Sequence, residues 1–232
     1  MAYTTVTLAT LQAQLEARWE SVPFWSATDA QNALNEALRT WNLLTAQWKR
    51  TETIVTAANQ VYYPLTSTLV YNLRAQFGSY PMTLSSLDDL DYGKPGWEGH
   101  TTTTSGQPTR PTLFTPVGLK NVAIWPADAT GNTTLVIDGV RSTPTLVNAG
   151  DFVDLGREEH GAILGEALHI SAFKEASQRF AATAQFHQQF LQAAAEKNPR
   201  IKASTFFRKA MGLDKQRFST PMKAEAVPMP TR

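Results

Sequence analysis

Hydrophobic positions in the first fifty residues recur every three or four residues, the spacing of one face of a helix. Leu8, Leu11 and Leu15 predict a short helix that ends before Pro23. A second, longer stripe runs through Leu34 and includes two tryptophans, and Thr28 or Asp29 is expected to cap that helix. The beginning of the chain is therefore expected to supply two helices.

The pattern then changes to a period of two, which is typical of strands. The segment TETIVTAANQVYYPL predicts a hairpin with an Ala-Asn turn, and Pro64 marks its end. Residues 79–111 are rich in Pro, Gly, Ser and Thr and predict a long loop. Further strands are expected at about residues 112–116, 120–125 and 133–140.

A helical pattern returns after Asp154 and continues for over forty residues without a proline, which predicts one long helix or two abutting helices. Asn198-Pro199 is expected to break this run. A short helix through the sequence FFRKAMG follows, with Gly212 as its C-terminal stop. The remaining residues show no periodicity and are expected to order only on a partner.

These elements predict an α+β fold: a helical bundle with a long C-terminal helix, an inserted antiparallel β-rich segment, and an extended C-terminal tail. The predicted domains are a helical core at residues 1–50 and 142–210, a β-rich insertion at 51–141 with its long loop at 79–111, and a partner-binding tail at 211–232.

Charge is distributed unevenly along the chain. The formal net charge is only +1, but residues 197–232 hold nine Lys/Arg and two acidic residues, which gives +7, against −6 for the remainder. The bulk charge excludes a strongly basic nucleic-acid binder, whereas the C-terminal segment is itself basic. No cysteine is present, which excludes disulfides and thiolate metal sites and fits a reducing cytoplasm.

The candidate chemistry in the sequence is sparse. Glu166 and His169 have the helical i, i+3 spacing of a metal-ligand pair. A di-iron site needs a second Glu-x-x-His and two further Glu residues, and no second such motif exists, so a pair on an exposed or interfacial helix face is the favoured interpretation. We expect no catalytic residue, no metal and no cofactor.

The stretch AIWPADATGNTTLVIDGV places Asp128, Thr130 and Asn132 at alternate positions of a polar loop. A calcium loop needs more carboxylates and a Glu at its twelfth position, where this chain has Gly139. Gly131-Asn132 instead supplies a turn with positive φ. We interpret this stretch as a connector between two strands of a hairpin.

Five features that occur in a fixed order carry a family resemblance over roughly residues 26–195. They are the tryptophan-rich early helix, Tyr62-Tyr63-Pro64-Leu65, the polar loop with Trp97 and Gly106-Gln107-Pro108, the strand ending in Ile124-Trp125-Pro126, and the long helix opened by Glu158-Glu159-His160. In this order they resemble the head-to-tail adaptor proteins (connector or neck proteins) of tailed bacteriophages. The chain departs from the pattern in having Tyr-Pro-Leu in place of Leu-Pro, and in its long basic extension.

The resemblance implies a structural virion protein at the head–tail interface, assembled in the host cytoplasm. It implies a homo-oligomeric ring, of about twelve copies, between the portal protein and the tail or nozzle proteins, with genome DNA passing through the lumen and no membrane. Adaptor tails dock on the portal, so the expected portal-binding residues are Phe206, Phe207, Arg208, Lys209, Met211, Lys215, Arg217 and Phe218. Trp97, His100 and Thr102 are expected to face the tail.

Three other functions remain open from the residues alone. Another phage tail or minor head structural protein would share most of these features. Glu166 and His169 leave open a ferritin-like metal enzyme, and the basic C-terminal segment leaves open a DNA-binding module.

Overall fold

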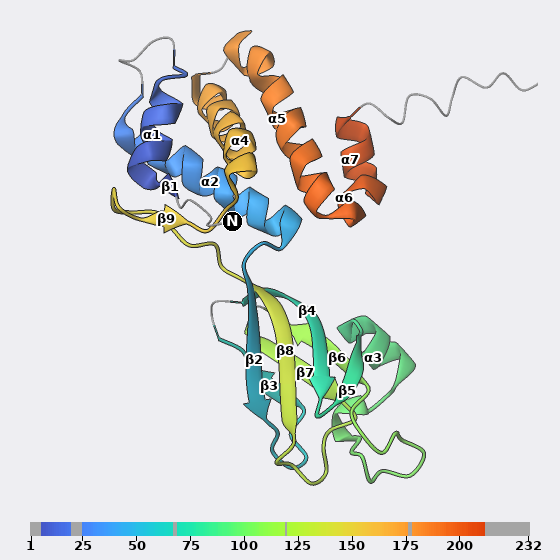
Figure 1. The fold of residues 1–232 in the computed structure, drawn as a ribbon. Coiled ribbons are helices and arrows are strands. Elements are labelled where there is room, and N and C mark those ends of the chain that lie inside the picture. Colours follow the sequence, from blue (N-terminus) through green and yellow to red (C-terminus); the bar gives the residue numbers. More distant parts are fainter. Residues whose placement is uncertain (1–5, 20–24, 67–68, 119, 176–177, 212–232) are drawn as a thin grey trace, which may run out of the picture. The chain divides into compact units, whose positions relative to one another are not determined.

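The computed structural model describes residues 6–19, 25–66, 69–118, 120–175 and 178–211 (Figure 1). The chain divides into two compact units: unit 1 consists of residues 1–37 with 154–232, and unit 2 of residues 38–153. The predicted α+β class is confirmed, because unit 1 is helical and unit 2 is built around a sheet. The domain boundaries expected at residues 50/51 and 141/142 stay predictions.

Unit 1 contains helices from both ends of the chain, and helix α2 continues from unit 1 into unit 2. The elements are β1 (Val6–Thr7), α1 (Leu8–Glu16), α2 (Ala27–Thr45), α4 (Arg157–Glu175), α5 (Gln178–Lys197), α6 (Pro199–Ala203) and α7 (Thr205–Ala210). Both predicted N-terminal helices are present. The long run predicted after Asp154 forms two helices, α4 and α5.

Local hydrogen bonds set where α1 and α2 begin. Thr7 caps α1 by accepting the N–H of Thr10 at 3.4 Å. The Ser26 hydroxyl accepts the N–H of Asp29 at 3.2 Å, and the Asp29 carboxylate accepts the N–H of Ser26 at 3.1 Å. This reciprocal capping box makes Ser26 the capping residue of α2. The expected cap at Thr28 or Asp29 is therefore wrong, although Asp29 takes part in the box.

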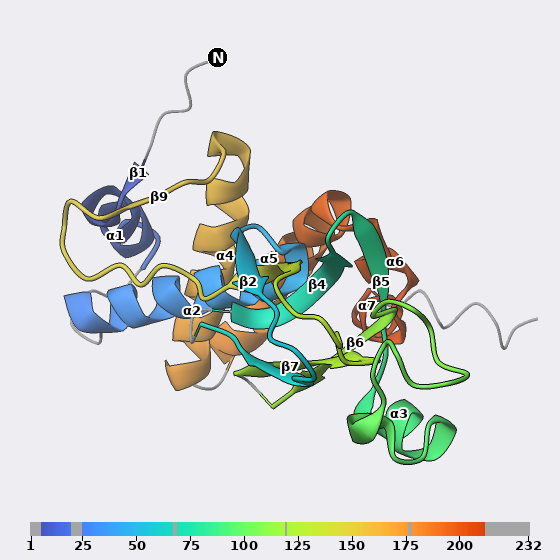
Figure 2. The ribbon, with the colours of Figure 1, turned by 90° about the horizontal axis from the view of Figure 1, so that it is seen from below.

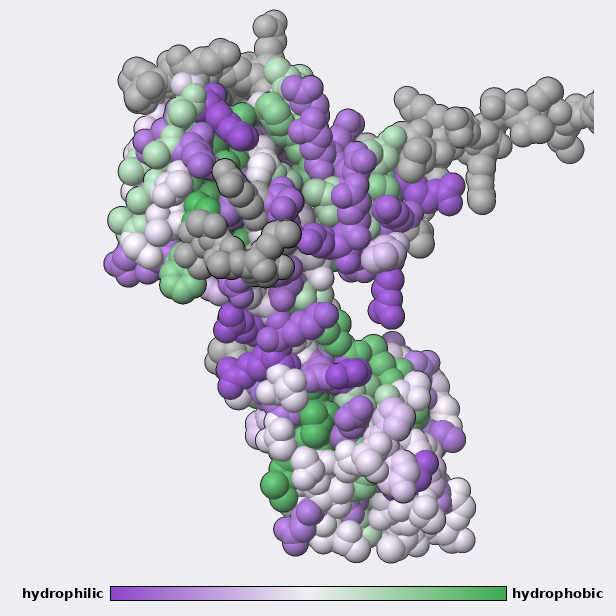
Figure 3. Space-filling view, viewed as in Figure 1, coloured by the Kyte–Doolittle hydropathy of each residue, from purple (hydrophilic) through white to green (hydrophobic). Residues whose placement is uncertain are grey.

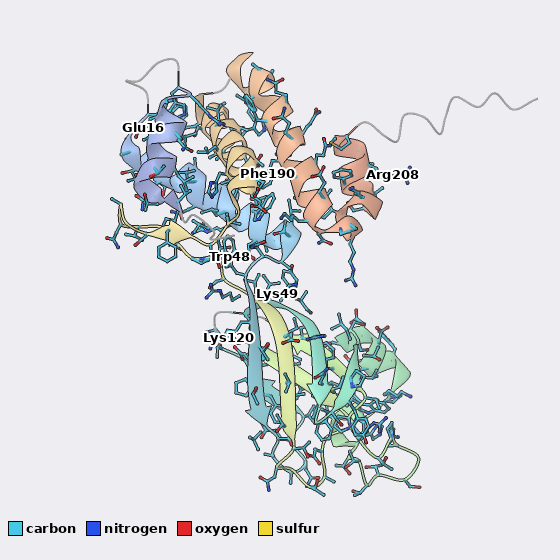
Figure 4. The ribbon with its side chains drawn as sticks, viewed as in Figure 1. Glu16, Trp48, Lys49, Lys120, Phe190 and Arg208 are labelled. Carbon is cyan, nitrogen blue, oxygen red and sulfur yellow. The ribbon has the colours of Figure 1, made fainter. Side chains whose placement is uncertain are left out.

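Helices α4 and α5 pack against each other and form the centre of unit 1 (Figures 1 and 2). Phe190 of α5 is fully buried in this packing and is labelled in Figure 4. At Gly165 of α4 an added Cβ would lie 3.2 Å from the Cβ of Phe186, so the two helices approach closely at this glycine. The other buried apolar residues on these helices are Ile163, Leu164, Ala167, Ala172, Leu191, Ala194 and Ala195.

The short helices α6 and α7 follow the predicted break after α5. The Asn198 side chain accepts the N–H of Arg200 at 3.3 Å, and Pro199 is the first residue of α6. Ser204 caps α7 by accepting the N–H of Phe207 at 3.2 Å. Ile201 and Phe207 are buried, so both helices are held by apolar contacts. The predicted stop at Gly212 and the extended tail lie outside the described residues.

Unit 2 contains a seven-stranded sheet in the order β2-β8-β4-β5-β6-β7-β3, and all neighbouring pairs are antiparallel except β5 with β6. The strands are β2 (Lys49–Val55), β3 (Tyr62–Pro64), β4 (Leu69–Phe77), β5 (Tyr80–Leu84), β6 (Leu113–Val117), β7 (Asn121–Trp125) and β8 (Thr134–Arg141). The short strand β9 (Phe152–Val153), the helix α3 (Leu87–Gly93) and the 3-10 helix η2 (Trp97–Gly99) complete the unit.

The three strands predicted near residues 112–140 are confirmed as β6, β7 and β8, but both predicted hairpins are wrong. Strand β2 pairs with β8 and β3 pairs with β7, so β2 and β3 stand at opposite ends of the strand order. Likewise β7 and β8 are not paired with each other. The predicted loop at residues 79–111 contains β5, α3 and η2. The sequence pattern predicts no element at residues 69–77, where β4 lies.

The sheet curls so that its two end strands share one core (Figure 2). Glu52 of β2 is buried, and its carboxylate accepts the N–H of Thr66 at 3.1 Å and also the Thr66 hydroxyl. Ile54 of β2 and Leu65, which follows β3, pack against one cluster. The cluster consists of Tyr63, Ala75, Phe77, Met82, Phe114, Val122, Ile124, Leu135 and Ile137. Curling buries the inner face of every strand of the sheet without a covering helix layer.

Candidate functional site

The portal-binding residues expected from the sequence fall partly on α7 and partly beyond the described residues. Lys209 is exposed, Arg208 and Met211 are half-buried, and Phe207 is 6% exposed and packs within unit 1. Phe206 lies in α7. Arg208 is labelled in Figure 4. Lys215, Arg217 and Phe218 lie outside the described residues.

The surface of α6 and α7 is basic. Arg200, Lys202 and Lys209 are exposed, and Arg208 is half-buried beside them. No acidic residue occurs in the sequence from 199 to 211. Figure 3 shows hydrophilic residues over these two helices. A cationic surface held on short, capped helices can bind an acidic protein surface or phosphate groups.

The three residues expected to face the tail are all held by hydrogen bonds within unit 2. Trp97 is buried, and its Nε1 donates to Asp91 at 2.7 Å. His100 is half-buried and accepts a hydrogen bond from Nε1 of Trp125 at 3.2 Å. The hydroxyl of Thr102 accepts the N–H of Ala129 at 3.0 Å. These contacts give the loop a defined conformation, and its role toward the tail stays a prediction.

The polar connector between β7 and β8 is explained by its own hydrogen bonds. Asp128 is buried and accepts the Thr56 hydroxyl at 2.8 Å, the Thr130 hydroxyl at 2.9 Å and the Thr130 N–H at 3.0 Å. Burial alone would raise the pKa of Asp128, but these hydrogen bonds outweigh it and hold the pKa below its ordinary value.

The predicted positive-φ turn in this connector is confirmed. Gly131 and Asn132 have φ angles of 71° and 58°. An added Cβ at Gly131 would lie 2.7 Å from the backbone nitrogen of Ala58, so only glycine fits there. The polar residues of the connector are therefore used to build a turn that joins two strands which are not neighbours in the sheet.

Glu166 pairs with a histidine other than His169, its predicted i, i+3 partner. The Glu166 carboxylate accepts from Nδ1 of His187 on α5, at 2.9 and 3.1 Å to its two oxygens. His169 instead has its Nδ1 2.9 Å from the hydroxyl of Thr183. The His169 ring stacks on those of Phe180 and His187, with centroids 4.5 and 5.2 Å apart.

The two histidines of this cluster are shifted in opposite directions. The hydrogen bond to Glu166 raises the pKa of His187 above its ordinary value, against the effect of burial. Burial lowers the pKa of His169. Among the described residues no group of three or more His, Asp or Glu side chains is placed to hold a metal ion. The cluster joins α4 to α5 through an ionisable hydrogen bond.

Unit 1 also has an open, aromatic-walled hollow of about 780 Å³. Trp19 and Trp25 stack with their ring centroids 5.6 Å apart and form one wall, and Phe186 lies on another. The hollow is further lined by Arg18, Gly161, Leu168, Ser171, Ala172, Ala182, Thr183, Gln185 and Gln189. In the part of the chain that the structure describes, no helix is long and apolar enough to cross a membrane.

A helical unit with a basic C-terminal surface, joined to a unit with a curled sheet and a polar, well-anchored loop, defines an α+β protein with several surfaces suited to protein contacts. The family model described as SU10 adaptor protein matches residues 6–212, and the chain belongs to this family. No curated protein matches the chain.

Membership identifies the chain as a phage adaptor, a structural protein of the virion that contacts other virion proteins such as portal or tail proteins. The family resemblance drawn from the order of sequence features is confirmed at this level.

Proposed function

We propose that the protein forms a closed ring, of about twelve copies, that joins the portal to the tail and lets genome DNA pass through its lumen. The observation that carries the proposal is the adaptor family match over residues 6–212. A ring of this kind needs a head-to-tail interface whose rotation closes. The protein itself has a structural role and requires no cofactor for it.

In this proposal the portal contact is made by α7 and by the basic residues that follow it. Lys209 is exposed and Arg208 is half-buried on α7. Lys215, Arg217 and Phe218 continue the basic and apolar sequence. An acidic cleft of the portal would take these side chains, and repetition around the ring makes many weak contacts sufficient through avidity.

The buried residues of α6 and α7 decide where a truncation should be placed. Ile201 and Phe207 are buried in unit 1, so a cut before α6 would remove part of its core. A cut after Met211 keeps both residues. We expect this truncated chain to have the melting temperature of the full chain and to lose about tenfold or more of its portal affinity.

A second variant tests the charge contribution on α7 directly. Arg208→Glu combined with Lys209→Glu should weaken portal binding and make the remaining binding less sensitive to salt. Lys120→Glu, an exposed charge reversal in unit 2, is the matched control (Figure 4). Portal binding that survives both the truncation and the α7 reversal would contradict the portal contact.

The loop with Trp97, His100 and Thr102 would face the tail or nozzle proteins, at a site separate from the portal contact. The rival proposal within the virion is another tail or minor head protein. Copy number distinguishes the two, because twelve copies seated on the portal, counted by electron cryomicroscopy of particles, support the adaptor ring. Sixfold or threefold assemblies would move the protein further down the tail.

A further inference from the structure

Helix α3 carries an exposed aromatic side chain on its outer face. Tyr92 is 87% exposed, which makes it the most exposed of the large hydrophobic side chains among the described residues. Asp88 lies one helical turn earlier on the same side, while Leu90 is buried against the sheet. Figure 2 shows α3 standing outside the strands of unit 2. No described residue of unit 2 covers this outer face.

The surroundings of Tyr92 are acidic. Between residues 87 and 99 the chain has four carboxylates and the single cation Lys94. Three of the carboxylates, Asp89, Asp91 and Glu98, accept hydrogen bonds from Ser86, Trp97 and Tyr62. The side chain of Asp88 is exposed and forms no hydrogen bond or ion pair with another described residue. An exposed tyrosine beside a carboxylate fits a partner rich in Lys or Arg, which can pair with the acid and lie over the ring.

Helix α6 in unit 1 has the complementary charge. Arg200 and Lys202 are exposed, and neither forms an ion pair with another described residue. The nearest acidic residue along the chain, Glu196, precedes the helix, and none follows within the described residues. One chain therefore has both an unpaired acidic face with an aromatic anchor and an unpaired basic face.

We propose that the outer face of α3, with Asp88 and Tyr92, docks on α6, with Arg200 and Lys202, of a second copy of this chain. Two different faces of the same protein form a heterologous contact, and when its rotation closes, repeating the contact gives a ring in which neither face is left unpaired. The inference rests on the proposed ring and assigns residues to its interface.

Charge reversal tests the contact from both sides. One variant carries Asp88→Lys and the other carries Arg200→Glu with Lys202→Glu. Assembly is measured by incorporation into capsids that lack this protein, with the copy number read from native mass spectra and images. We expect each variant alone to be incorporated about tenfold less than the wild type, because like charges then face each other at every contact.

Mixing the two variants in equal amounts is the decisive arm. The lysine that replaces Asp88 in one variant then meets the reversed α6 of the other, and the unaltered Asp88 meets an unaltered α6. The mixture is expected to assemble again, with the variants in a 1:1 ratio and alternating around the ring. Tyr92→Ala, which removes the aromatic anchor and no charge, should also lower incorporation of the chain.

Two exposed reversals serve as matched controls, Glu16→Lys and Lys120→Glu (Figure 4). Both should assemble as the wild type does, and all variants should keep its melting temperature. Single variants that assemble normally would overturn the proposal. The proposal would also be overturned if the mixture failed to assemble while a chain carrying Asp88→Lys, Arg200→Glu and Lys202→Glu together did assemble. That result would mean that the faces of α3 and α6 meet within a single copy.

The outcome separates this inference from the proposed function. Wild-type protein that joins no capsid would contradict the adaptor role itself. Wild-type protein that forms rings on capsids, together with single variants that form the same rings, would contradict only the contact between α3 and α6.

Discussion

The two units bury carboxylates with different kinds of partner. In unit 2, Asp128 accepts hydrogen bonds from hydroxyl and backbone N–H groups. Glu52 of the end strand β2 likewise accepts from the hydroxyl and the N–H of Thr66, which follows the other end strand, β3. In unit 1, Glu166 is paired with His187, and Glu159 with Lys197 at 2.5 Å. The donors to the two buried carboxylates of unit 2 are neutral, whereas those to the two buried carboxylates of unit 1 are ionisable.

This difference separates the pH responses of the two units. A carboxylate held by neutral donors keeps the same interactions throughout the neutral range, because only its own protonation can disrupt them. A carboxylate held by histidine changes its interaction wherever the histidine titrates, which is close to neutral pH. We therefore expect the Asp128 and Glu52 networks of unit 2 to be insensitive to pH between about 5 and 8, and the pair of Glu166 with His187 in unit 1 to respond to it.

The largest expected effect is the loss of the Asp128 network in unit 2. Asp128→Ala removes three hydrogen bonds to a buried carboxylate and should lower the free energy of unfolding by about 3 kcal/mol. The pKa of Asp128 is lowered in the fold, so its contribution is present above the unfolded pKa and is lost as pH falls through the folded pKa. Urea unfolding at several pH values measures this difference.

Asp151→Ala is the matched control for that variant. Asp151 also closes a turn, by accepting the N–H groups of Val147 and Asn148 at 2.7 and 2.8 Å, but this turn is exposed. Its removal should cost much less stability. Equal losses in the two variants would show that burial of Asp128 is not what makes its network important.

The same network explains which parts of the fold could be predicted. The strands β6, β7 and β8 were found from a local alternation of side chains, and the turn at Gly131 from its own residues. Strand pairing was not predictable in this way, because Thr56 bonds to Asp128 across 72 positions in sequence. Strand β4 was missed, and its two register shifts interrupt the alternation on which the prediction of a strand depends.

The next effect in size concerns His187 in unit 1. His187→Ala leaves the buried Glu166 carboxylate without its donor and should cost about 2 kcal/mol. His187→Gln keeps a neutral donor and should cost about 1 kcal/mol at low pH only. The pKa of His187 is raised in the fold, so the contribution of its charge is complete below its unfolded pKa of 6.5 and is lost as pH rises through the folded pKa.

His169→Gln is expected to show the opposite dependence on pH. Burial lowers the pKa of His169 in the fold, so the wild type loses stability from this residue as pH falls below 6.5. The glutamine variant removes that loss and gains in relative stability at low pH. The stability of each glutamine variant relative to the wild type, measured between about pH 5 and pH 8, should change with pH in opposite directions for His187→Gln and His169→Gln. Changes in the same direction would contradict the opposite pKa shifts of the two histidines.

The histidine cluster also shows the limit of predicting a site from spacing. The i, i+3 rule placed Glu166 and His169 on one face of α4, and both do lie there. The partner that matters for Glu166 is on α5, 21 residues further along the chain, because α4 and α5 pack side by side. The exposed basic residues of α6 and α7 were found from composition, but the burial of Phe207 depends on packing that composition does not contain.

The smallest expected effect concerns an ion pair at the surface of unit 1, where solvent weakens the attraction between the two charges. Lys174 forms an ion pair with Asp29, and its Nζ lies 5.6 Å from the ring centroid of Trp25. The hydrogen bond from Lys174, together with those from Ser26, lowers the pKa of Asp29 to about 2.

Lys174→Met should move this pKa part of the way back to 3.8, because Ser26 still donates to the carboxylate. A carboxyl NMR titration measures the shift. The contribution of Asp29 to stability is present above pH 3.8 and is lost as pH falls through about 2. Because salt and solvent screen this exposed pair, the wild type and the variant should nevertheless unfold alike at neutral pH in high salt. A large loss of stability under those conditions would mean that the pair is shielded from water, and the contrast between the buried pairs of unit 1 and its exposed one would then fail.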